Sequence, residues 1–72
     1  MPVRNIIGKN IKKFRKLRNI TQEQLAARVN ILGRELDRPM ISKIECQTRE
    51  IIDVEIKCIA EALGVDIQDL FK

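Results

Sequence analysis

Five residues at the start of a short predicted helix carry side chains suited to the edges of DNA bases: Arg38, Pro39, Met40, Ser42 and Lys43. Arg38 can bond one guanine through two donors, and Lys43 can do so more loosely. Ser42 can donate to a base or a phosphate, while Pro39 and Met40 offer apolar contact to a thymine methyl. An ordinary exposed helix face can carry the same residues, so their types alone leave both interpretations open.

A second set of residues is suited to phosphate. Thr21 and Gln22 stand where a helix is expected to begin, and free N–H groups and the positive end of the helix dipole favour an anion there. The basic candidates are Lys9, Lys12, Lys13, Lys16 and Arg18 near the start of the chain, and Arg49 in the loop expected after the short helix that begins at Arg38. The first five cannot all face one way on a helix, so only some are expected to approach a DNA backbone.

Charge is distributed unevenly along the chain. Residues 1–20 hold seven basic and no acidic side chains, whereas residues 51–72 hold five acidic and two basic ones. This asymmetry suggests one polyanion-facing side, although a basic run is often only a solvated helix face. The chain has no His, so it lacks the commonest general base and a usual zinc ligand. We therefore expect no enzymatic activity, metal, cofactor or small-molecule ligand.

Length and hydropathy set the broad class. With 72 residues the chain is expected to form one domain, 1–72, with little apolar core to spare. No run approaches the roughly 20 apolar residues of a membrane span, and the first residues lack the apolar core of a signal peptide. The expected location is therefore cytoplasmic, with no membrane contact. Cys46 and Cys58 are expected to be reduced and packed as small apolar residues.

Helical spacing and capping residues predict the elements. Ile7, Ile11 and Phe14 indicate a first amphipathic helix over about 5–18. Thr21 and Gln24 form a capping box for the second helix, which stops naturally at Gly33 or, alternatively, at Asn30 with a longer loop to follow.

The second half of the chain predicts three more helices. Asp37 caps a third helix with Pro39 in its first turn, ending near Cys46 or Gln47. Asp53 is expected to cap a fourth helix that Gly64 closes, and Asp66 to open a short fifth one. The sequence therefore predicts an all-α, compact five-helix domain, with its two-helix unit at about 21–46.

A charged pair is expected to join the first and third helices. Arg15 lies beside the apolar stripe of its helix, and Glu45 follows the inward-facing Ile44. We expect a partly buried Arg15–Glu45 ion pair with a structural role, which argues against Glu45 as a catalytic acid.

Three blocks of sequence together resemble a known family. The run IGKNIKKFRKLRNITQEQLA, then ISKIE, then IAEALGVDIQDLF, is similar to the Cro/repressor-type (xenobiotic-response-element) helix-turn-helix domains of phage and bacterial transcription regulators. The resemblance covers about residues 7–71 and implies a lambda-repressor-like fold and a sequence-specific transcriptional regulator, in the first instance a repressor. It implies phosphate contacts at Thr21 and Gln22, base contacts at Arg38, Pro39, Met40 and Lys43, and the Arg15–Glu45 pair.

The resemblance also implies partners. Members of the family bind palindromic double-stranded operators as dimers, often through the last helix. Here that predicts a homodimer through Val65, Ile67, Leu70 and Phe71, although Leu70 or Phe71 could equally finish the monomer core. The alternative function is a protein-interaction module, such as an antitoxin-like or adaptor subunit, that uses the acidic C-terminal third.

One segment departs from the family pattern. The link between the second and third helices is longer than usual by more than one helical turn. Either the second helix runs on to Gly33 and a loop continues to Leu36, or the helix stops at Asn30 and a long connection follows. The orientation of the third helix in a DNA groove therefore cannot simply be copied from the family.

Overall fold

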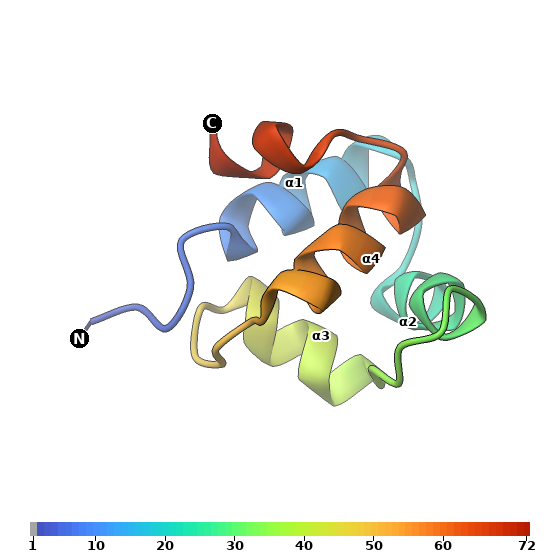
Figure 1. Cartoon of the computed structure of the whole chain (residues 1–72), viewed down its shortest axis with the longest axis horizontal. Coiled ribbons are helices and arrows are strands. Elements are labelled where there is room, and N and C mark those ends of the chain that lie inside the picture. The colour runs from blue at the N-terminus through green and yellow to red at the C-terminus, as the bar shows by residue number, and fades with distance from the viewer. Residues whose placement is uncertain (1) are drawn as a thin grey trace.

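The computed structural model describes residues 2–72 as four α-helices followed by one 3-10 helix. Figure 1 shows them in chain order: α1 (Gly8–Leu17), α2 (Gln22–Ile31), α3 (Arg38–Glu45), α4 (Asp53–Leu63) and η1 (Ile67–Phe71). No strand occurs among residues 2–72, so the all-helical class is confirmed. The count of five helices is only roughly right, because the last element is a 3-10 turn.

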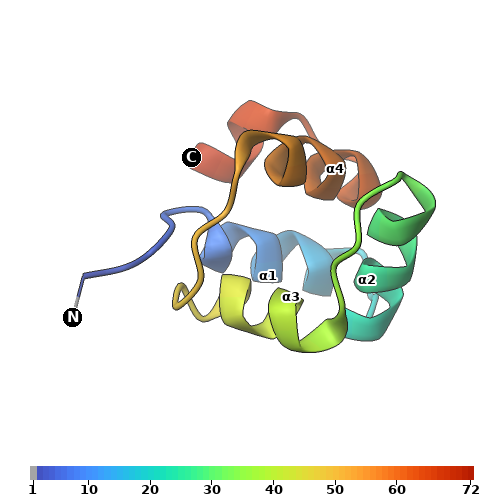
Figure 2. The same ribbon diagram turned by 60° about the horizontal axis from the view of Figure 1, so that its bottom comes forward.

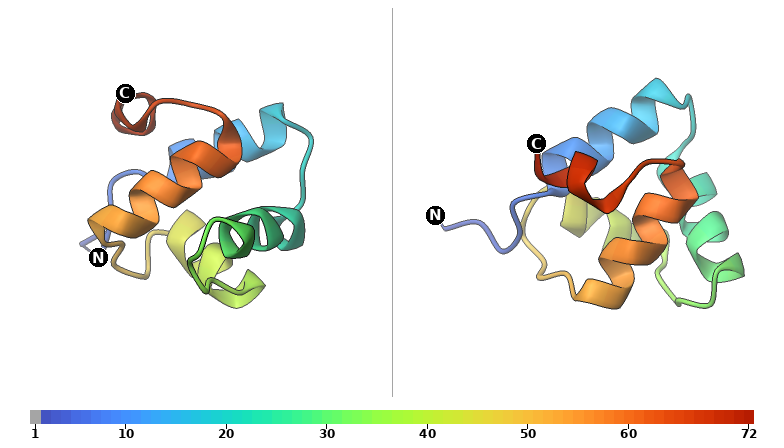
Figure 3. Two further views of the ribbon diagram at one scale, coloured as in Figure 1. Left: turned by 45° about the vertical axis from the view of Figure 1, so that its right-hand side comes forward. Right: turned by 45° about the horizontal axis from the view of Figure 1, so that its top comes forward.

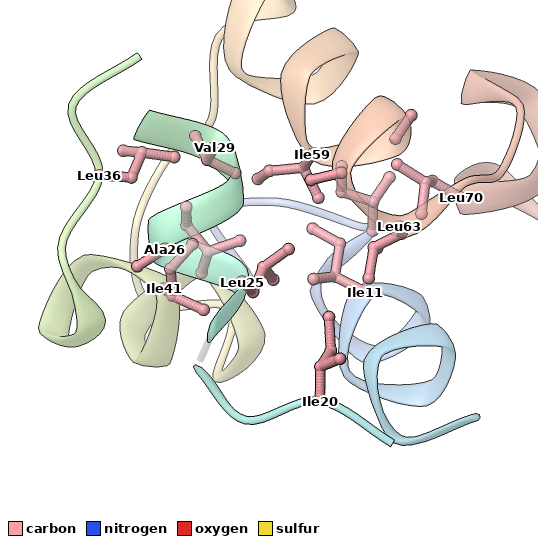
Figure 4. Close-up of a cluster of buried hydrophobic side chains, with 14 residues drawn as sticks. Ile11, Ile20, Leu25, Ala26, Val29, Leu36, Ile41, Ile59, Leu63 and Leu70 are labelled. Atoms are coloured by element: carbon pink, nitrogen blue, oxygen red, sulfur yellow. The ribbon is translucent and has the colours of Figure 1, made fainter. Parts of the chain in front are cut away.

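All five elements pack around one apolar core. Helix α3 contacts both α1 and α2, while η1 contacts α1 and α4 (Figures 2 and 3). Each element contributes a fully buried side chain, shown in Figure 4: Ile11, Leu25, Ile41, Ile59 and Leu70. Leu70 is therefore part of the monomer core, which confirms the second of the two alternatives predicted for it and removes it from the expected dimer interface.

The predicted helix starts are mostly confirmed. Gln24 N–H donates to Thr21 Oγ1 and Thr21 N–H to Gln24 Oε1, which completes the capping box of α2. Asp37 caps α3 by accepting the N–H of Met40 at 2.9 Å. Asp53 does not cap α4 but is its first residue. The N-cap position is held by Ile52, whose N–H donates to Glu55 Oε1 at 3.2 Å.

The lengthened link is anchored at both ends. Helix α2 runs to Ile31, one residue beyond the shorter expectation, and Gly33 adopts a left-handed φ of 100° just past its end. Arg34 N–H then donates to the carbonyl of Val29, five residues earlier, which is the 6→1 hydrogen bond of a Schellman motif. The rest of the link is held by Leu36, which is buried and whose carbonyl accepts from Asn30 Nδ2. The link therefore leads into α3 along a defined path.

The first helix starts three residues later than predicted. Instead of joining the helix, Asn5 accepts the N–H of Gly8 through Oδ1 at 2.7 Å. Its amide nitrogen donates to the carbonyls of Ile44, at 3.1 Å, and Arg49, at 2.8 Å. Asparagine side chains compete with helix hydrogen bonds in this way. The bonds draw the start of α1 so close to α3 that a Cβ on Gly8 would overlap the carbonyl oxygen of Ile44.

The cysteines differ from each other in burial. Both are free thiols; Cys58 is half-buried, whereas Cys46, directly after α3, is exposed. The expectation that both pack as small apolar residues is therefore wrong for Cys46.

The contact at Gly8 predicts a measurable cost of adding one methyl group. Gly8→Ala should lower the free energy of unfolding by about 1–3 kcal/mol, because α1 must move away from the backbone of α3. Urea denaturation measures it, with Lys9→Ala as the control on the exposed side of the same helix, expected to change stability by no more than about 0.5 kcal/mol. Equal effects of the two substitutions would contradict the close approach.

Candidate nucleic-acid interface

The buried pair expected from the sequence is present. Arg15 donates through Nε to Glu45 Oε2 at 2.7 Å and through Nη2 to Oε1 at 3.0 Å, and both residues are buried. Its third nitrogen, Nη1, donates to the carbonyl of Ile20 at 2.9 Å. Two parallel charge-assisted hydrogen bonds fix the orientation of both side chains. The end of α3 is thereby joined to α1 and to the turn that follows α1.

Gln22, the first residue of α2, joins the same carboxylate. Its Nε2 donates to Glu45 Oε1 at 3.0 Å, so Glu45 connects three helices. An amide nitrogen carries two hydrogens, and only one is used by Glu45. The hydroxyl of Thr21 likewise accepts from Gln24 but keeps its own hydrogen. Both side chains can still donate to an anion while holding the fold.

A hollow lies where these helices meet. We call it the junction hollow; its lining residues are Arg15, Lys16, Asn19, Ile20, Thr21, Gln22, Glu23 and Arg38. It brings the N-terminus of α2 together with the side chains of Lys16 and Arg38. A helix N-terminus flanked by two cations favours a phosphate, although Glu23 adds one negative charge at its edge.

The five basic candidates near the start of the chain, four in α1 and Arg18 directly after it, separate into two groups. Four of them recur at i, i+3, i+4 and i+7 and share one exposed face, which we call the lysine stripe: Lys9, Lys12, Lys13 and Lys16. Arg18 points the other way and donates through Nε to the carbonyl of Leu63 at 2.9 Å and through Nη2 to that of Gly64 at 3.3 Å. Arg18 therefore satisfies the end of α4.

The outer face of α3 carries the residues expected to read bases. Arg38, Pro39 and Lys43 are exposed, whereas Ser42 and Met40 are half-buried. Met40 packs against the core, which leaves less of its side chain for a partner. The exposed part of the reading face is thus a positively charged strip along one short helix.

Arg49, expected as a phosphate ligand, is held by an acid of α4. Its guanidinium donates to the two carboxylate oxygens of Glu55 at 3.1 and 3.2 Å and to the carbonyl of Glu50 at 2.9 Å. The hydrogen bond to Glu55 is the main cause of a raised pKa at Arg49, against the lowering effect of burial. Sequence reasoning missed the role of Glu55.

Burial and charge act in opposite directions on Glu55. Burial by itself raises the pKa of its carboxyl group. The hydrogen bonds from Arg49 and from the backbone of Ile52, with the nearby charges of Arg49 and Arg34, outweigh burial and leave the pKa of Glu55 below its ordinary value. The folded protein therefore holds Glu55 as a carboxylate.

Among residues 2–72, no group of three or more His, Cys, Asp or Glu side chains is placed to hold a metal ion. None of the helices formed there is long and apolar enough to cross a membrane.

Comparison with protein families gives one match over most of the chain. The model of a family described as Helix-turn-helix (HTH_3) matches residues 11–70. No curated protein is significantly similar to the chain.

Several solved structures share the fold. The restriction-modification controller protein C.AhdI from Aeromonas hydrophila is 28% identical with a TM-score of 0.81, covering 90% of this chain and 87% of that one. The hypothetical transcription factor NHTF from Neisseria is 30% identical with a TM-score of 0.82, covering 99% and 76%. The controller protein C.Esp1396I, solved as a tetramer in complex with its natural 35 base-pair operator, is 31% identical with a TM-score of 0.72, covering 92% and 91%.

The buried pair predicts a large stability difference between two glutamates. Glu45→Ala leaves the buried charge of Arg15 without a partner and should lower the free energy of unfolding by about 3–5 kcal/mol. Glu50→Ala, which breaks the exposed pair with Arg4, should cost less than about 1 kcal/mol. Chemical denaturation followed by circular dichroism compares them. A loss at Glu45 as small as that at Glu50 would contradict the buried role.

The lowered pKa of Glu55 predicts a pH dependence. Its stabilising effect is complete above the ordinary glutamate pKa of the unfolded chain, about 4.3, and is lost as the pH falls through the lower pKa of the folded protein. Glu55→Gln should therefore be less stable than the native protein at neutral pH and lose less stability on acidification. Urea denaturation at several pH values measures both, and parallel curves would rule out the effect.

Proposed function

This chain belongs to the helix-turn-helix family, of the Cro/repressor type, and we propose that it reads a palindromic DNA operator as a homodimer. It is a DNA-binding transcription regulator of that class. The proposed mechanism is that α3 enters the major groove with its N-terminal residues at the base edges, as second helices of such units do. Occupying the operator would then exclude other proteins from it and repress transcription.

The observation that carries this proposal is that the lysine stripe, the junction hollow and the exposed face of α3 adjoin one another. Lys16 belongs to the lysine stripe and also lines the junction hollow, and Arg38 lines the same hollow while opening the reading face of α3. A single DNA duplex laid on this side would meet base-reading and phosphate-binding groups together. Such an arrangement separates contacts that fix register from contacts that choose sequence.

We assign the phosphate contacts to two places. Thr21, Gln22 and Lys16 would bind one phosphate at the junction hollow, using the free hydroxyl hydrogen and the second amide hydrogen. The remaining lysines of the stripe would approach the neighbouring backbone. Arg18 and Arg49 are left out, because their guanidinium groups already bond carbonyl or carboxylate oxygens.

We assign base reading chiefly to Arg38 and Lys43, with Pro39 beside them. These are the exposed side chains of α3, and a guanidinium can bond guanine through two hydrogen bonds. Ser42 and Met40, which are half-buried, would contact the bases only with the exposed parts of their side chains. The defined path of the lengthened link sets where α3, and with it Arg38, begins.

The homodimer is proposed through the surface between α4 and η1. Ile67 and Phe71 are 44% and 49% exposed, and with the half-buried Val65 they line an apolar groove there. C.Esp1396I forms a tetramer on its operator, which supports assembly of like subunits on DNA. The rival interaction-module hypothesis is weakened because Glu55, part of its acidic surface, is buried against Arg49.

Two substitutions separate reading from anchoring. Arg38→Ala should weaken binding to a preferred duplex by about 1–3 kcal/mol and flatten the preference over a scrambled duplex. Lys16→Ala should weaken both duplexes alike and make the salt dependence shallower by about one unit of slope. Fluorescence anisotropy against salt measures both. Sequence preference that survives Arg38→Ala unchanged would sink the assignment of α3.

A further inference from the structure

The segment before α1 is fastened to the loop after α3. We call residues 2–7 the arm and residues 47–50 the post-α3 loop. Arg4 N–H donates to the carbonyl of Gln47 at 2.9 Å, and Gln47 Nε2 returns a hydrogen bond to the carbonyl of Asn5 at 3.0 Å. The buried amide of Asn5 then bonds the carbonyls of Ile44 and Arg49. The arm therefore has a fixed position beside the C-terminal end of α3.

This anchoring places an unassigned cation at that end of the reading helix. The guanidinium of Arg49 is held by Glu55, with only 27% of its side chain exposed. The side chain of Arg4 is 63% exposed and contacts Glu50, itself 75% exposed, through Nη1 at 3.3 Å. A single exposed ion pair contributes little stability, so another anion can replace Glu50 at low cost.

Arg4 and the junction hollow lie at opposite ends of α3. Helix α3 has eight residues and is about 12 Å long, and the major groove of B-DNA is wide enough to admit an α-helix. The junction hollow lies at the N-terminal end of α3, where Arg38 begins the helix. The arm lies at the opposite end, as Figures 1 and 2 both show. An α3 docked in the groove would thus have a cation near each of its two ends.

We propose that Arg4 binds a backbone phosphate of DNA at the C-terminal end of α3, exchanging Glu50 for it. This inference rests on the proposed docking of α3 in the major groove. Arginine suits the task because its planar guanidinium can give two hydrogen bonds to one phosphate. The bonds made by Asn5 already hold the backbone of Arg4, so less freedom is lost on binding than from a free terminus. The contact adds affinity and orientation without reading sequence.

The test measures how binding to a mixed-sequence duplex of several helical turns depends on salt, using the whole chain. Arg4→Ala should make the slope of log affinity against log salt shallower by about 0.9 for each bound protomer. Between about 50 and 200 mM salt, the native protein should therefore lose about three- to fourfold more affinity per protomer than the variant does. Arg4→Lys, which keeps the charge, should restore most of the slope.

The matched control is Arg28→Ala. Arg28 is also exposed, and it donates to the carbonyl of Ala62 on α4, so its loss should leave the slope at the native value. Thermal unfolding of each variant verifies that the fold is kept. A native slope for Arg4→Ala together with a shallower slope for Lys16→Ala would overturn the role of Arg4 and leave the DNA-binding proposal standing. Absence of binding by the native protein at low salt would overturn both.

Discussion

A carboxylate buried at the meeting point of three helices stabilises a small domain only when its hydrogen bonds are satisfied. Glu45 meets that condition by accepting two bonds from Arg15 and one from Gln22. Because Glu45 ends α3 and Gln22 begins α2, one side chain sets the relation between the helix proposed to read bases and the helix end proposed to bind phosphate. The fold and the interface consequently depend on the same ion pair.

The basic residues of the chain divide into structural and available ones. Four arginines bond carbonyl or carboxylate oxygens of the protein: Arg15, Arg18, Arg28 and Arg49. The lysine stripe, Lys43 and Arg38 remain exposed, and Arg4 is tied only by an exposed pair. The number of basic side chains therefore overstates the surface open to DNA, because these four guanidinium groups bond other parts of the fold while the ammonium groups of the stripe face solvent. This division follows from the flat, multidentate geometry of arginine.

Local signals in the sequence predicted much of this structure, and distant contacts account for what was missed. The capping box at Thr21 and the Asp37–Pro39 start of α3 could be placed because caps act within one helical turn. Asn5 and Ile44, which share a hydrogen bond, are 39 positions apart in the sequence. No local pattern therefore predicts this bond, or the close approach to Ile44 that requires a glycine at position 8. The link was predicted as two alternatives; helix α2 ends at Ile31, and Leu36 of the link is buried in a core that also holds residues far along the chain. The assignments of individual residues to bases and phosphates stay predictions.

Selecting bound duplexes from a random DNA pool tests most directly whether α3 reads sequence in a symmetric dimer. The bound pool should converge on two inverted half-sites whose centres are about 10 base pairs, one helical turn, apart, because each protomer would place its α3 in successive major grooves on one side of the duplex. A single half-site without its inverted copy would contradict the dimer. A bound pool as varied as the starting pool would contradict sequence reading by α3.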